Sequence, residues 1–101
     1  MKILTDGHKY ELSSLEGTNT QIIQFIEKHP KGNTTELETI ADGTTNEEVI
    51  EMLIDRINFL QSKFPCRENA IVITKLEESL MWLHKRTQDR VKRNVEGKQL
   101  V

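Results

Sequence analysis

Hydrophobic and polar positions in the first twelve residues follow the pattern of a β-hairpin. Residues 2–5 and 8–12 have the composition of short strands, and Asp6 and Gly7 lie between them. An Asp-Gly pair supplies the positive φ angles that a tight hairpin turn requires. The pattern therefore predicts an antiparallel hairpin in this segment.

A second pair of strands is indicated between residues 21 and 41. Residues 21–27 are rich in β-branched and aromatic side chains, residues 30–33 form a turn sequence, and residues 34–41 continue the strand pattern. With a connection at residues 16–19, the simplest arrangement is two short hairpins in one antiparallel sheet.

After Asp42 and Gly43 the period of the apolar positions changes from two to about 3.6, which indicates a helix. Thr44 and Glu47 have the spacing of a capping box. Pro65 ends the helix, because proline lacks an N–H donor and disfavours a helical residue before it. The predicted apolar stripe is formed by Val49, Leu53, Ile57, Leu60 and Phe64.

A second helix is predicted from about residue 67 to residue 93, and Asn94 and Gly97 are its stop signals. Two antiparallel helices joined by a very short connection make a helical hairpin. Apolar residues in the second helix recur at alternating steps of three and four, which is a short heptad seam. This seam consists of Ile73, Leu76, Leu80 and Leu83.

The chain is expected to be a single α+β domain over residues 1–101, with a strand region at 1–42 and the helical hairpin at 43–97. Its hydrophobic fraction of 36% and aromatic fraction of 5% are low for a lone domain, and 30% of the residues are charged. Helices that share a seam between subunits would offset the small core, so we expect an oligomer.

Charge and cysteine content exclude several classes. Residues 1–50 carry 4 Lys/Arg and 9 Asp/Glu, residues 51–101 carry 10 and 7, and the net charge is −2. This balance argues against binding of polymeric nucleic acid. Cys66 is the only cysteine, which leaves no intrachain disulfide or thiolate metal cluster. The apolar runs are shorter than a membrane span, and no signal-peptide pattern is present, so a cytoplasmic protein is expected.

Extending the seam forwards from Leu83 places Thr87 and Arg90 on the same face of the second helix, and extending it backwards places Asn69 there. If several subunits meet along the seam, Thr87 and Arg90 face a shared axis, where like charges repel unless an anion lies between them. The alternative is that the helix ends project beyond the core and are solvated.

The same end of the second helix is rich in cations. Residues 85–93 contain five Lys/Arg and one acid, and Arg86, Arg90 and Arg93 fall on one helical face. Arginine matches phosphate oxygens bidentately and stacks on bases. The alternative is that cations favour a helix C-terminus through the macrodipole.

The start of the second helix is a second candidate. Helix N-terminal N–H groups bind anions, and Arg67 and Asn69 add side-chain donors. Phe59 lies off the predicted stripe and either packs or offers its face to a base, whereas Trp82 is expected to pack.

Candidate catalytic groups are few. His8, His29 and His84 lack the spacing of metal ligands, and Cys66 has no histidine near it in the sequence to act as its base. We therefore predict a binding protein, not an enzyme, with no catalytic residue, metal or cofactor.

Several motifs resemble one protein family: the bacteriophage sponges that sequester nucleotide signals and counter the Thoeris and CBASS bacterial defences. The similar segments are DGTTNEE at 42–48, FPCREN at 64–69, TKLEE at 74–78, MWLHKRT at 81–87 and VEG at 95–97. The strand region, with YEL at 10–12 and QFIEK at 24–28, is more similar to the Thoeris anti-defence branch.

The resemblance implies sequestration of cyclic ADP-ribose isomers, and of cyclic oligonucleotides in separate pockets, without degradation, by a homohexamer built from dimers in the infected host cell. It places Phe59 and Asn69 in the ADP-ribose-type pocket, and Arg86 and Arg90 in the cyclic-oligonucleotide pocket. Asn94 departs from the glycine that relatives have before VEG, but Asn can adopt the same backbone conformation.

Two other functions stay open at this point. One is a structural or regulatory phage oligomer that binds a protein partner through its sheet and has no small ligand. The other is an RNA-binding module that uses the basic helix end.

Overall fold

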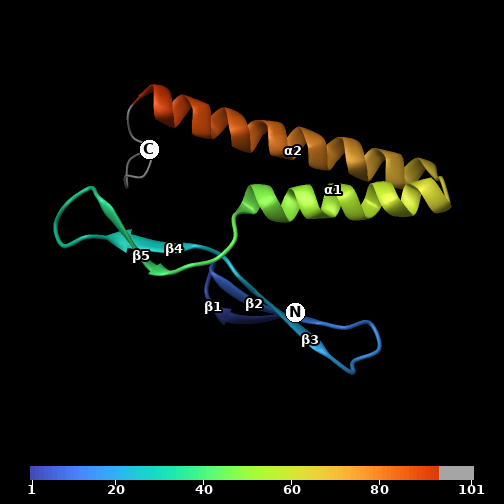
Figure 1. The fold of residues 1–101 in the computed structure, drawn as a ribbon, viewed down its shortest axis with the longest axis horizontal. Coiled ribbons are helices and arrows are strands. Elements are labelled where there is room, and N and C mark those ends of the chain that lie inside the picture. The colour runs from blue at the N-terminus through green and yellow to red at the C-terminus, as the bar shows by residue number, and fades with distance from the viewer. Residues whose placement is uncertain (94–101) are drawn as a thin grey trace. The chain divides into compact units, whose positions relative to one another are not determined.

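The computed structural model describes residues 1–93 and divides the chain into two compact units (Figure 1). The strand unit comprises Met1–Thr45, and the helical hairpin begins at Asn46. The predicted stop signals Asn94 and Gly97, and the VEG motif, lie outside the described residues. No helix in the described part of the chain is long and apolar enough to cross a membrane.

The strand unit contains five short antiparallel strands in two sheets. The first sheet has the order β1-β2-β3, and β4 and β5 form the second. The bounds are Lys2–Thr5 for β1, Lys9–Ser13 for β2, Thr20–Gln24 for β3, Glu27–Pro30 for β4 and Leu37–Ala41 for β5. Together with the helices that follow, these strands confirm the α+β class.

The prediction of one sheet is wrong, because the predicted strand at 21–27 is divided after Gln24. The N–H of Phe25 donates to the carbonyl of His8 at 2.7 Å, whereas the N–H of Ile26 donates to the carbonyl of Thr44 at 2.9 Å. The chain thus changes its hydrogen-bonding partner at this point. The first sheet ends there and the second begins at Glu27.

Gly43 permits a close approach of two backbone segments at this crossing. The N–H of Thr44 donates to the carbonyl of Gln24 at 2.8 Å, and Thr44 forms a parallel bridge with Phe25. A Cβ atom at position 43 would overlap the carbonyl oxygen of Gln24 and lie 2.7 Å from the carbonyl carbon of Phe25. Only glycine fits here without a backbone shift.

The helical hairpin consists of α1 (Asn46–Lys63) and α2 (Arg67–Lys92), which pack on one another. Thr45 is the residue before α1; the predicted cap Thr44 is instead held in the backbone bridge to residues 24–26. The seam of α2 is less exposed than its surroundings, as predicted, at Ile73, Leu76, Leu80 and Leu83.

The predicted stripe of α1 is partly wrong. Leu53 and Phe64 are exposed, whereas Ile50 and Ile54 are half-buried in their place. The apolar face of α1 is wider than one partner helix covers, so a sequence stripe does not show which edge is used. No hydrophobic side chain among the described residues is fully buried, in agreement with the low apolar content.

Candidate ligand-binding ends of the helical hairpin

The end of the hairpin that carries the inter-helix turn is held by Gln61 and Cys66. The side-chain amide of Gln61 bonds both backbone polar groups of Cys66, and the Sγ of Cys66 accepts from the N–H of Asn69 at 3.4 Å. Cys66 is therefore the N-cap of α2. This geometry fixes where Arg67 and Asn69 leave the turn.

Phe59, Arg67 and Asn69 lie at this turn end, Phe59 in α1 and the other two in the first turn of α2. Phe59 is 55% exposed, so packing within the hairpin does not bury it, and the Nζ of Lys63 lies 5.5 Å from the centroid of its ring. Asn69 is half-buried, and its side-chain amide makes no hydrogen bond with another described residue. An aromatic face and amide groups are thus available close to cations.

The opposite end of α2 carries the cation-rich segment. Arg86 borders a hollow of about 240 Å³ whose other lining residues are Trp82, Lys85, Asp89 and Arg93. The Nζ of Lys85 lies 3.7 Å from a carboxylate oxygen of Asp89, which offsets its charge. Arg86 and Arg93 are therefore the main positive groups around the hollow. Trp82, which was expected to pack, is 60% exposed in the described chain, so the hairpin itself does not bury it.

Arg90 differs from its neighbours in burial. It is 8% exposed, the one buried residue of α2, whereas Arg86 and Thr87 are exposed. The alternative in which this helix end is simply solvated therefore fails for Arg90. A guanidinium removed from water interacts more strongly with an anion than an exposed one does.

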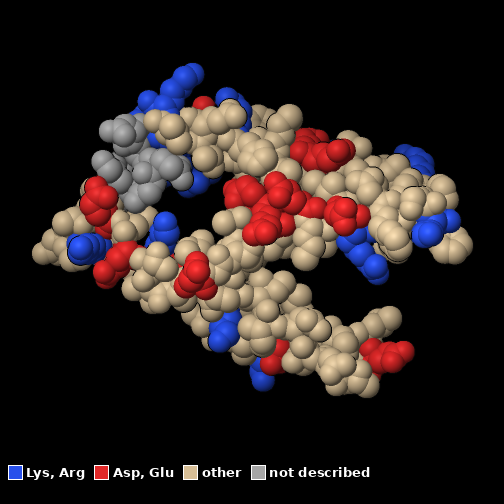
Figure 2. Space-filling view, viewed as in Figure 1, with Lys and Arg blue, Asp and Glu red and all other residues tan. Residues whose placement is uncertain are grey.

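The two ends are separated by distance and by charge. A rise of about 1.5 Å per residue puts Asn69 and Arg90 about 30 Å apart along α2. Acidic side chains gather over the middle of the hairpin in Figure 2. A groove of about 510 Å³ runs between the helices there, and its acids Glu51, Asp55 and Glu77 disfavour a phosphate ligand. None of the six predicted site residues lines that groove.

The histidines are arranged differently from their sequence spacing. His84 lies on α2 and borders the acidic groove, but His8 and His29 of the strand unit lie close together beside Glu27. The spacing of the histidines in the sequence did not predict this group, because β2 and β3 lie between His8 and His29 in the chain. The one usable signal was Glu27-x-His29, since alternate residues of a strand share a face.

The described residues thus define a small α+β protein with a helical hairpin that carries cationic groups at both ends. A family model described as "Acb2/Tad1, hairpin domain" matches residues 19–88. The chain belongs to this family, as its sequence motifs predicted.

A curated relative supports the same assignment. "Thoeris anti-defense 1" of Bacillus phage SBSphiJ7 is 59% identical over 58 residues. The match covers 56% of this chain and 41% of that protein, so less than half of the relative's length is matched.

Proposed function

We propose that this chain is a phage anti-defence protein that sequesters nucleotide immune signals without degrading them. The observation that carries the proposal is the 59% identity to a protein named Thoeris anti-defense 1, together with the hairpin family match. The ligands are cyclic ADP-ribose isomers and, at a separate site, cyclic oligonucleotides. The protein would act in the cytoplasm of the infected bacterial cell.

Phe59, Arg67 and Asn69 would bind the ADP-ribose type of ligand at the turn end. The exposed Phe59 ring offers a surface for an adenine, and Arg67 supplies charge-assisted donors for the phosphates. The Asn69 amide can both donate and accept, which suits ribose hydroxyls and base edges. The N-terminus of α2 adds a positive dipole end.

Arg86, Thr87 and Arg90 would bind cyclic oligonucleotides at the opposite end. Arg86 and Arg90 are one turn apart on α2, so both can face a ring of phosphates. Copies of the hairpin that meet at this end of α2 would bring several such arginines together. Their mutual repulsion is then relieved by the anionic ligand.

A homohexamer built from dimers is part of this proposal. Large hydrophobic side chains are exposed on both helices, among them Met52, Leu53, Phe64 and Met81. An exposed apolar surface of this kind favours association, because burying it removes apolar area from water. The alternative function is a structural or regulatory oligomer that binds a protein partner through its sheet and has no small ligand.

Co-elution tests the proposed function. The protein is mixed with one cyclic ADP-ribose isomer or one cyclic oligonucleotide, separated by gel filtration and heated, and the released compound is chromatographed. We expect the ligand to co-elute and to be recovered unchanged. A ligand that elutes apart from the protein would favour the protein-partner alternative, and a linear or hydrolysed product would show an enzyme.

A further inference from the structure

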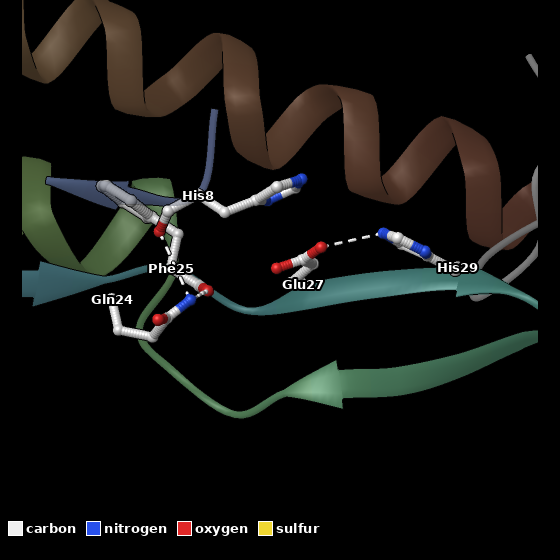
Figure 3. Close-up of polar contacts among 5 residues, drawn as sticks. All are labelled: His8, Gln24, Phe25, Glu27 and His29. Atoms are coloured by element: carbon white, nitrogen blue, oxygen red, sulfur yellow. Dashed lines mark hydrogen bonds and ion pairs between the residues drawn. The ribbon is translucent and has the colours of Figure 1, made fainter. Parts of the chain in front are cut away.

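Three potential metal ligands from distant positions in the sequence meet in the strand unit (Figure 3). One ligand atom each from His8, Glu27 and His29 lies within 4.8 Å of the other two. The Nε2 of His29 is 2.9 Å from a carboxylate oxygen of Glu27. We propose that these three side chains bind a divalent transition-metal ion such as Zn²⁺.

The ligand set suits such an ion. Two imidazole nitrogens and one carboxylate oxygen are a donor set that Zn²⁺ takes in three-ligand sites, with water in the fourth position. Ligand atoms about 2.0–2.1 Å from a tetrahedral ion are about 3.3 Å apart. A pair of atoms at the 4.8 Å limit therefore needs to close by about 1.5 Å, and the Glu27–His29 pair at 2.9 Å needs to open slightly. The His29 side chain is 53% exposed, which leaves room for its imidazole ring to rotate into such a position.

The fold positions the three side chains on one side of the strand unit. Glu27 and His29 are alternate residues of β4 and therefore share a face. The register shift beside Glu27 leaves Ile40 of β5 without a partner, so the alternation within β4 is intact. His8 ends the β1–β2 turn, and its carbonyl accepts from the N–H of Phe25 at 2.7 Å.

The side chain of Gln24 also holds the backbone of His8 next to that of Phe25. Its Nε2 donates to the carbonyl of Phe25 at 2.7 Å and to that of His8 at 3.4 Å, as Figure 3 shows. The backbone that carries His8 is thereby tied to the segment that leads directly into Glu27. The group is thus held in place by backbone and side-chain hydrogen bonds before any ion binds.

Burial and core size both favour an ion here. The Glu27 side chain is only 14% exposed, and a carboxylate that has lost most of its water requires a positive partner. No hydrophobic residue described in the strand unit is fully buried. Small units with little core are often stabilised by a structural metal, and this ion would join the turn of the first sheet to the second sheet.

Calorimetric titration of the untagged, chelator-treated full chain with ZnCl₂ tests the site. We expect one ion per chain, and His8→Ala and His29→Ala should each weaken binding by about tenfold or more. His84→Ala removes a histidine of the helical hairpin and is the matched control, with an unchanged affinity. Circular dichroism checks that each variant is folded.

Titration of the unmodified chain with Co²⁺ gives a second readout, which requires no variant. We expect the visible absorption of a four- or five-coordinate cobalt ion with nitrogen and oxygen ligands. A sulfur-to-cobalt charge-transfer band would place the metal at Cys66 and overturn the proposal. So would absence of Zn²⁺ binding by the unmodified chain, or loss of binding in His84→Ala alone.

Discussion

Gln61 bonds both backbone polar groups of Cys66. The Oε1 of Gln61 accepts from the N–H of Cys66 at 3.0 Å, and its Nε2 donates to the carbonyl of Cys66 at 2.9 Å. A residue near the end of α1 therefore fixes the N-cap of α2 across the turn at Pro65. The positions of Arg67 and Asn69 at the start of α2 depend on this pair of bonds.

Gln61→Ala removes both bonds and should lower the free energy of unfolding of the hairpin by about 1–3 kcal/mol, because each neutral hydrogen bond contributes about 0.5–1.5 kcal/mol. Urea unfolding followed by circular dichroism measures the change. Asn58→Ala is the control, since its amide bonds only the carbonyl of Ile54 within α1. Equal losses in the two variants would show that the bonds across the turn have no special role.

Gly43→Ala should destabilise the strand unit by at least about 2 kcal/mol. The added methyl forces apart the segments that carry Gln24 and Thr44, whose two backbone hydrogen bonds contribute about 1 kcal/mol each. Gly17→Asn is the control: position 17 has open space around it, and Asn tolerates its φ of 74°. A Gly43→Ala chain as stable in urea as Gly17→Asn would contradict the close approach.

The helices were predictable from sequence because their signals are local. Pro65 specifies the turn between the two helices, and the heptad spacing from Ile73 to Leu83 specifies the seam of α2. Neither signal depends on the rest of the chain. The division of the strands into two sheets was not predictable. It depends on Phe25 and Ile26 bonding to His8 and to Thr44, which are pairings between residues distant in sequence.

The same distinction applies to the candidate sites. Residues on one helix keep their spacing, so the separation of Asn69 from Arg90 followed from the sequence. The exposure of Phe59 and Trp82 did not, because an apolar pattern shows that a side chain can pack but not whether its own chain covers it. The group formed by His8, Glu27 and His29 required the folded strand unit.

Light scattering should give a mass of about six times the 11.7 kDa chain. Exposed apolar side chains of the helices, such as Met52 and Phe64, are expected to be buried in this assembly. Phe64→Ser places a hydroxyl on that surface and should lower the mass, whereas Leu15→Ser, in the strand unit, should not. A monomeric mass for the unmodified chain at micromolar concentration would contradict the hexamer.

Trp82 is the single tryptophan and borders the hollow beside Arg86, so its fluorescence reports on that end of α2. A cyclic oligonucleotide should change the emission. A cyclic ADP-ribose isomer should not, because Asn69 is about 20 Å from Trp82 along the helix. Equal changes with both ligands would contradict separate sites, and Trp82→Phe supplies the background signal.

The most direct test of two-ended sequestration is calorimetric titration of two variants with both ligand types. Arg90→Ala removes charge-assisted hydrogen bonds worth about 1.5–3 kcal/mol each, so it should weaken a cyclic oligonucleotide about tenfold or more and leave a cyclic ADP-ribose isomer nearly unchanged. Asn69→Ala should do the reverse, since its backbone cap to Cys66 is retained. Lys92→Ala removes an exposed cation at the same end and controls for charge alone. Equal weakening of both ligands by Arg90→Ala in an assembly of unchanged mass, or no binding of either ligand by the unmodified chain, would contradict two-ended sequestration.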